Sequence, residues 1–404
     1  MRVTGEEKTM LVIEGGRLLL PDGTCVIGDL SVDQGRIAAV GNIRDVAGDV
    51  DRLDARGCTV IPGLIDMHSH LTLVPDVDKS HKVSRAKIAL AAARQAVRAL
   101  RAGITRCRDI GGYRHVDLDL RNAIEAGLIP GPKMVCAGKF IAITGGHAWP
   151  YIREADGEAE VRKAVREQIQ AGADFIKLMG SGGVGRADES EGAVQFSFAE
   201  VKAIVEEAEA AGTVAAAHVH PERAISNAVR AGVRSIEHGT HLTPELASAM
   251  VDQGIFLVPT FAVYRAIATD GRWPELAPRA QQVYDTKIKT FLSAVERGVR
   301  WGIGTDAGSF LPVSGIADEM EIAHGLGFSP VEVLQKATQG NAELWNWSDV
   351  GRLEVGLTAD LVLVAGDPTT HLSDVRKVQV TIARGKVYDW RVIDSAPGGP
   401  WLAN

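Results

Sequence analysis

The chain has 404 residues, of which 46% are hydrophobic and 24% charged, and this balance excludes wholesale disorder. Its 44 basic and 51 acidic side chains give a formal net charge of −7. We therefore expect no nucleic-acid partner, because phosphate backbones attract dense basic patches. No apolar run approaches ~18 residues, so we expect neither a membrane-spanning helix nor a membrane partner.

The cysteines and the start of the chain indicate a cytoplasmic protein. The four cysteines are widely spaced without a CxxC pair, as in proteins of a reducing compartment. The first residues, MRVTGEEKTMLVIEGG, place two glutamates before a very short apolar run. A secretory signal would have a basic start and a longer apolar stretch.

Both ends of the chain have the sequence pattern of short strands. In the first sixty residues, apolar runs alternate with turn signals such as Asp22-Gly23, and near the other end Gly366-Asp367-Pro368 separates similar runs. Each block alone has too few strands to bury a face. We therefore predict one composite β-sandwich domain formed by residues 1–60 and 346–404.

Residues 61–345 alternate between apolar strand candidates and Ala-rich helical patterns. Residues 84–101 and 198–211 repeat apolar side chains at helical spacing. The strand candidates are 59–67, 103–108, 133–137, 174–178, 214–218, 235–237, 255–258 and 300–304. This pattern predicts an α/β fold, a (β/α)8 TIM barrel, whose usual size is roughly 250 residues. An open doubly wound sheet is the alternative, but it would place a glycine fingerprint after the first strand, where histidines stand instead.

The first predicted barrel strand ends in a pair of histidines. His68 and His70 are two residues apart, so both point to the same face of an extended strand and could hold one divalent metal. Taken alone, the motif is equally compatible with two solvent-facing histidines.

Lys177 lies in FIKLMGSGG, inside an apolar strand. Burial lowers the pKa of an amine, and a neutral amine can react with CO2 to give a carbamate that bridges two cations. The alternative for Lys177 is an ordinary lysine that reaches solvent or pairs with an acid.

Three further candidate ligands end later strands. His218 ends VAAAH, His238 ends SIEH, and Asp306 follows WGIGT. The carboxyl ends of barrel strands form the rim where active sites are built. Six groups able to bind metal on one rim favour a metal centre over unrelated structural residues.

In this pattern the chain resembles the amidohydrolase superfamily. The matching motifs are IPGLIDMHSH, FIKLMGSGG, AAHVH, SIEHG and GTDAG, in that order. RDIGG, ITGGHAW and AHVHPERAISNAVRAGVRSIEHG are similar to the branch that contains imidazolonepropionase-like proteins and binuclear Xaa-Pro dipeptidases. Members of that branch remove C-terminal residues from N-acyl amino acids and dipeptides, and relatives hydrolyse ochratoxin, phenylureas and organophosphate esters.

The resemblance implies a binuclear centre. His68, His70 and Asp306 would hold one cation, His218 and His238 the other, and carboxylated Lys177 would bridge both. Zinc is the first choice, although manganese or cobalt suits the same ligands. A hydroxide shared by the two cations would attack the substrate carbonyl, with Asp306 moving its proton to the leaving nitrogen.

Two other side chains are candidate donors to the substrate. His147 follows Gly145-Gly146 and could donate to the developing oxyanion or to a substrate carboxylate. Tyr264 is the second candidate, although a tyrosine that only covers the barrel edge is an equal alternative. Arg186 could anchor a substrate carboxylate, and His220 shares the face of His218.

We therefore expect a metal-dependent amidohydrolase that cleaves an amide C–N bond in a small, carboxylate-bearing molecule such as an N-acyl amino acid or a Xaa-Pro-type dipeptide. The same chemistry would serve a urea, carbamate, lactone or phosphoester, and a scaffold of this fold without catalysis is the other alternative. The helix expected over 280–297 could support a homo-oligomer.

Overall fold

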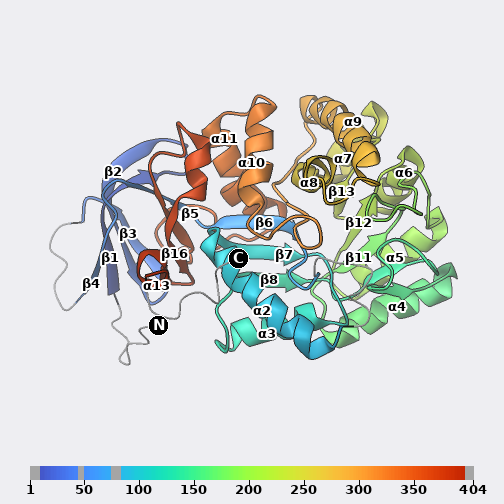
Figure 1. Ribbon diagram of the computed structural model, residues 1–404, viewed down its shortest axis with the longest axis horizontal. Coiled ribbons are helices and arrows are strands. Elements are labelled where there is room, and N and C mark those ends of the chain that lie inside the picture. The colour runs from blue at the N-terminus through green and yellow to red at the C-terminus, as the bar shows by residue number, and fades with distance from the viewer. Residues whose placement is uncertain (1–9, 44–49, 74–82, 396–404) are drawn as a thin grey trace.

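The computed structural model describes residues 10–43, 50–73 and 83–395 (Figure 1). Residues 1–9, which contain the two glutamates near the start of the chain, lie outside the described residues. Residues 396–404, expected at the end of the β domain, also lie outside them. Within the described ranges, no helix has the length and apolar character of a membrane span.

Strands from both ends of the chain share one sheet. Among the described residues this sheet has eight strands in the order β17-β16-β15-β5-β1-β2-β3, with β4 paired to β1. The strands are β1 (Met10–Leu19), β2 (Cys25–Asp33), β3 (Arg36–Gly41), β4 (Asp51–Asp54), β5 (Cys58–Pro62), β15 (Leu361–Ala365), β16 (Val378–Ala383) and β17 (Lys386–Asp389). The two blocks meet where β5 runs antiparallel to β15, and Figure 1 shows the blue and red strands together at one end of the molecule.

The remaining strands pair in parallel in two groups. One contains β6 (Leu64–Ser69), β7 (Ile104–Asp109) and β8 (Lys133–Cys136). The other has the order β10-β9-β11-β12-β13-β14. Its strands are β9 (Phe140–Ala142), β10 (Ile152–Glu154), β11 (Ile176–Met179), β12 (Ala215–Val219), β13 (Ser235–His238) and β14 (Phe256–Val258). Most of their side chains are buried, as is typical of parallel strands covered on both faces, although β7 and β13 carry ionisable residues and β8 and β10 are partly exposed.

Residues 300–304, expected as a strand, form only isolated backbone contacts. Gly302 N donates to Leu257 O of β14 (3.0 Å), and Met67 N of β6 donates to Ile303 O (3.1 Å). The side chain of Asn341 takes the place of further ladder bonds, because it accepts from Ile303 N (3.1 Å) and donates to Ile303 O (2.9 Å). This segment thus lies between the ends of the two parallel groups.

The helices lie around the parallel strands, apart from α13, which packs against β16 and β17 (Figure 1). They are α2 (Arg85–Arg101), α3 (Val116–Glu125), α4 (Gly157–Ala171), α5 (Phe198–Ala210), α6 (Glu222–Ala231), α7 (Pro244–Gln253), α8 (Phe261–Thr269), α9 (Ala277–Glu296), α10 (Ile316–Gly325), α11 (Pro330–Gln335), α12 (Asn341–Leu344) and α13 (Trp390–Ile393), with a π-helical turn at Lys336–Gly340 and a 3-10 turn at Leu372–Arg376. The two helices expected from periodicity, α2 and α5, are confirmed within a residue. Ser84 caps the first and Ser197 forms a capping box on the second.

Candidate metal centre

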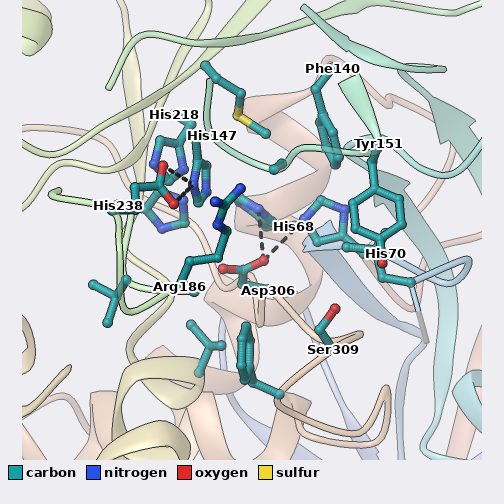
Figure 2. A pocket seen from close by; sticks show the side chains of 18 of the residues that line it. His68, His70, Phe140, His147, Tyr151, Arg186, His218, His238, Asp306 and Ser309 are labelled. Atoms are coloured by element: carbon teal, nitrogen blue, oxygen red, sulfur yellow. Dashed lines mark hydrogen bonds and ion pairs between the residues drawn. The ribbon is translucent and has the colours of Figure 1, made fainter. Parts of the chain in front are cut away.

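The six ligand candidates predicted from the sequence line one cavity, which His147, Tyr264 and Arg186 also line. Figure 2 shows the imidazoles pointing toward one another across it. The candidate ligands are His68, His70, Lys177, His218, His238 and Asp306. Lys177 lies within β11 rather than at its end, so its long side chain is what reaches the cavity.

The histidines form two groups. His68, His70 and Asp306 have candidate ligand atoms within 4.8 Å of one another, and the same holds for His218, His220 and His238. Asp306 Oδ1 lies 3.4 Å from His68 Nε2 and 3.1 Å from His70 Nε2. The division matches the two cation sites implied by the resemblance, with His220 as an addition to the second.

Hydrogen bonds fix which nitrogen the first two histidines present. His68 Nδ1 donates to Glu237 Oε2 (2.9 Å), and His70 Nδ1 donates to Gly111 O (2.7 Å). A carboxylate and a carbonyl only accept, so each Nδ1 carries the proton. When these rings are neutral, both Nε2 atoms therefore have a free lone pair toward Asp306, as a metal ligand requires.

The second group is oriented by different partners. Thr260 donates its one hydroxyl proton to Pro259 O (2.7 Å), so its oxygen accepts from His238 Nδ1 (2.7 Å) and leaves Nε2 as the ligand atom. His218 Nε2 donates to Gly182 O (3.1 Å), which leaves Nδ1 instead. Burial lowers the pKa of both rings, so both stay neutral and able to bind a cation.

Lys177 is buried without a hydrogen-bond partner for its Nζ within the described part of the chain. Burial lowers the pKa of this amine to about 8. A buried polar atom without a partner is costly, and a nearly neutral amine is the form that reacts with CO2. Neutral imidazoles, a carboxylate and a carbamate form a donor set suited to divalent cations, so the residues fit the implied metal pair.

Asp306 and His238 share an unusual backbone conformation. Their φ angles are 55° and 69°, in the left-handed region that non-glycine residues rarely occupy. Such strain concentrates at functional sites, where surrounding contacts impose it. Burial alone would raise the pKa of Asp306, but His68 and His70 hold it well below its usual range, so the carboxylate is ionised.

A buried ion pair between Arg108 and Glu237, which the sequence did not lead us to expect, supports His68 through the bond from its ring to Glu237. Arg108 Nη2 donates to Glu237 Oε1 (2.7 Å), and Arg108 Nε donates to Met67 O (2.6 Å). Both charged residues are 0% exposed. Although burial would raise the pKa of Glu237, Arg108 and the bond from His68 hold it below its usual range. The available signal was an ionisable residue inside each fully buried strand, ITRCRD and SIEH.

His147 lies beside the second histidine group. Its ring stacks on His218 with 4.2 Å between centroids, and its Nδ1 donates to Glu189 Oε1 (2.8 Å). Glu189, in the loop after β11, was not among the sequence candidates. It fixes the proton of His147 on Nδ1 when the ring is neutral.

The remaining candidates occupy the wall of the cavity. Tyr264, in α8, is buried, and its hydroxyl lies 3.2 Å from His220 Nε2. Burial raises the pKa of this phenol, so it keeps its proton. Arg186 pairs with Asp188 through its Nη2 (2.6 Å) while lining the cavity (Figure 2).

Comparison with known proteins identifies the family. The model of the amidohydrolase family matches residues 59–388. Ochratoxinase of Aspergillus niger is 30% identical over 98% of this chain and 89% of its own length. Imidazolonepropionase of Mycolicibacterium smegmatis is 25% identical, covering 90% of this chain and 93% of its own.

Solved structures agree over nearly the same span. A prolidase in complex with N-methylphosphonate-L-proline is 32% identical, with a TM-score of 0.87 over 94% of this chain and 100% of its own. Aspergillus niger ochratoxinase superposes with a TM-score of 0.84 at 28% identity, covering 95% of this chain and 96% of that chain. With its mixed α/β fold, its cavity of imidazoles and carboxylates and these relatives, the chain belongs to the amidohydrolase superfamily of hydrolases.

Proposed function

We propose that the chain is a binuclear metal-dependent hydrolase that cleaves an amide C–N bond of a small carboxylate-bearing substrate, an N-acyl amino acid or a Xaa-Pro-type dipeptide. The observation that carries this proposal is the convergence of six ligand groups on one cavity, with the proton of each histidine held away from the shared space.

Each cation would have its own set of ligands. His68, His70 and Asp306 would hold one, His218 and His238 the other, and carboxylated Lys177 would contribute to both. Bound divalent cations would supply Lewis acidity that polarises a carbonyl and lowers the pKa of water. Zinc suits imidazole and carboxylate ligands best.

Asp306 is the proposed proton carrier. Its Oδ1 faces both His68 and His70, and its pKa is held low, so the carboxylate is ionised and able to accept. The second carboxylate oxygen would take the proton of the attacking water and deliver it to the leaving nitrogen. Protonating that nitrogen is what lets an amine leave when the C–N bond breaks.

His147 and Tyr264 are the proposed donors to the substrate. Glu189 orients the His147 ring by accepting from Nδ1, and the doubly protonated ring would donate from Nε2 to the developing oxyanion or to the substrate carboxylate. Tyr264 keeps its proton because burial raises its pKa, so it can donate to the same groups.

The relatives and the cavity walls support the substrate class. One solved relative holds N-methylphosphonate-L-proline, and a Xaa-Pro dipeptidase 32% identical to this chain holds methionine in its active site. Both ligands carry a carboxylate. Apolar side chains line part of the cavity, including Phe140, Trp149, Val184, Ile267 and Phe310. An apolar substituent would lose little by entering it, whereas a charged one would be desolvated without a partner.

The test is a substrate screen on purified protein with metal quantified. N-acyl amino acids and Xaa-Pro dipeptides would be compared with aryl ureas and phosphoesters at matched concentration. We expect about two divalent cations per chain and the highest kcat/KM on an amide whose product is a free amino acid. Cation-free protein that stays inactive after addition of zinc and bicarbonate would overturn the proposal.

The domain organisation of the chain is also a proposal. We propose that the parallel strands form one (β/α)8 barrel over residues 61–345, supported by the hydrogen bonds of Gly302 and Ile303 to its two neighbouring strands. The composite β-sandwich of residues 1–60 and 346–404 is proposed from the shared sheet. The homo-oligomer and the cytoplasmic location stay predictions.

A further inference from the structure

Two buried ionisable side chains have no part in the chemistry proposed above. Lys287 lies in α9 and Glu319 in α10, and each residue is about 1% exposed. Ionisable side chains are almost never this deeply buried without a partner. Both reach the same short turn between β14 and α8, and neither lines the cavity.

Thr260, at the centre of this turn, has a strained backbone. Its dihedral angles are φ 52° and ψ 58°, in the left-handed region. A β-branched residue rarely adopts this conformation, which persists only where neighbouring contacts impose it. Lys287 supplies two such contacts, because its Nζ donates to Thr260 O (3.2 Å) and to Thr260 Oγ1 (3.3 Å).

Glu319 holds the other side of the same turn. Its carboxylate accepts from Phe261 N (2.9 Å) and from Ala262 N (2.6 Å), the first two amides of α8. These amides have no partner inside the helix, and a carboxylate at a helix N-terminus is also favoured by the helix dipole. The amine and the carboxylate therefore bind the same peptide group, the one that follows the strained residue, Lys287 through its C=O and Glu319 through its N–H.

The turn positions two groups of the cavity. The Thr260 hydroxyl accepts from His238 Nδ1 (2.7 Å) and thereby sets which nitrogen His238 presents. Tyr264 lies one helical turn further, and Lys287 Nζ is 3.9 Å from the centroid of its ring. An amine on the face of the ring limits how far the tyrosine can move.

We propose that Lys287 and Glu319 are positioning residues that act through Thr260 and Tyr264. By holding Thr260 in its strained conformation, they keep His238 Nε2 directed toward the second cation site, and they keep the Tyr264 ring against the cavity. The inference rests on the proposed function in one respect, namely that His238 is a cation ligand there and Tyr264 a substrate contact.

The first test is cation affinity. Lys287→Met replaces the amine with an apolar side chain of similar length, and Lys289→Met is the matched control on the exposed side of the same helix. We expect chelator competition with zinc to show affinity at least tenfold weaker in K287M and unchanged in K289M, because supports of metal-bound histidines typically contribute 10–100-fold. Unchanged affinity in K287M would overturn the inference.

A double-mutant cycle separates this pathway from a general loss of structure. Thr260→Val removes the hydroxyl that orients His238. If Lys287 acts through that hydroxyl, zinc affinity in K287M/T260V equals that of the weaker single variant, whereas independent effects would multiply. Multiplying losses would contradict the inference. If K287M does not fold, K287M/E319Q, in which both buried ionisable groups are replaced, takes the place of K287M in the double-mutant cycle.

A readout without metal makes the two proposals distinguishable. In a crystal structure of cation-free K287M, we expect Thr260 to leave the left-handed region and its bond with His238 to be lost. If this change occurs while the wild-type protein binds no cation, the proposed function fails, and of the inference only the hold of Lys287 on Thr260 and on the bond from His238 stands. If the wild type binds two cations and K287M keeps both the turn and the affinity, the positioning role fails alone.

Discussion

Replacing Glu237 with glutamine tests how His68 is oriented. The two carboxylate oxygens serve different donors, since Oε1 accepts from Arg108 Nη2 (2.7 Å) and Oε2 accepts from His68 Nδ1 (2.9 Å). Glutamine has a single acceptor oxygen. The bond to the fully buried Arg108 cation is charge-assisted and therefore stronger, so we expect that oxygen to face Arg108 and the NH2 group to face His68.

The consequence is a change of tautomer. An NH2 group beside Nδ1 requires His68 to accept there, which moves the ring proton to Nε2, the atom facing Asp306. Losing such an outer partner typically lowers metal affinity 10–100-fold, equivalent to about 1.4–2.7 kcal/mol. The cation-free protein should also lose stability, by up to roughly 3–5 kcal/mol, because Arg108 keeps its charge without a counter-charge.

Chelator competition with zinc measures the affinity, and urea unfolding of the cation-free protein measures the stability. Glu209→Gln, an exposed position on α5, is the control and should change neither. Zinc affinity of E237Q within twofold of wild type, in a folded protein, would refute the tautomer argument. Loss of stability without loss of zinc affinity would mean that Glu237 stabilises the protein core but does not orient His68 for a cation.

Three further substitutions address other groups of the cavity. Asp306→Asn should lower kcat at least 100-fold, because it removes the proposed proton acceptor; activity within tenfold of wild type would exclude that role. His147→Asn should lower kcat/KM about 10²–10³-fold with the cation content retained, whereas unchanged kcat/KM would remove His147 from the mechanism. Lys177→Met should reduce the cations bound per chain measured by elemental analysis, and two retained cations would contradict its role as bridge. In the cation-free wild type, the pKa of Lys177 is lowered from 10.5 to about 8, so the unfolded state binds more protons between these values and stability should rise with pH through that window by up to about 3 kcal/mol. Unfolding of K177M across pH 8–10 should lack this rise.

Local sequence patterns were enough to pick out the candidate ligands that line the cavity. A strand period of two places His68 and His70 on one face, and the apolar runs of parallel strands end at His218 and His238. Helices α2 and α5 were also predictable, because their apolar spacing and their serine caps lie within a few residues of one another. These features depend on neighbours along the chain, so they can be read without knowing the fold.

The irregular backbone pairing of residues 300–304 depends on a distant side chain. Its Gly302 and Ile303 have the apolar pattern of a strand, but the Asn341 amide, 38 residues further on, binds Ile303 N and shares Ile303 O with Met67 N of β6. No sequence feature near residues 300–304 indicates that a distant side-chain amide binds there. Only the packing of the turn before α12 against β6 brings the amide there.

By itself, the sequence determined which side chains could bind cations and where along the chain they occur. The tertiary structure decided which nitrogen each histidine presents and what holds it. Glu237 supports His68 from 169 residues away, and Lys287 reaches Thr260 from another helix. The physical reason is that a hydrogen bond requires two groups within about 3 Å, and folding, not sequence spacing, brings such distant groups together.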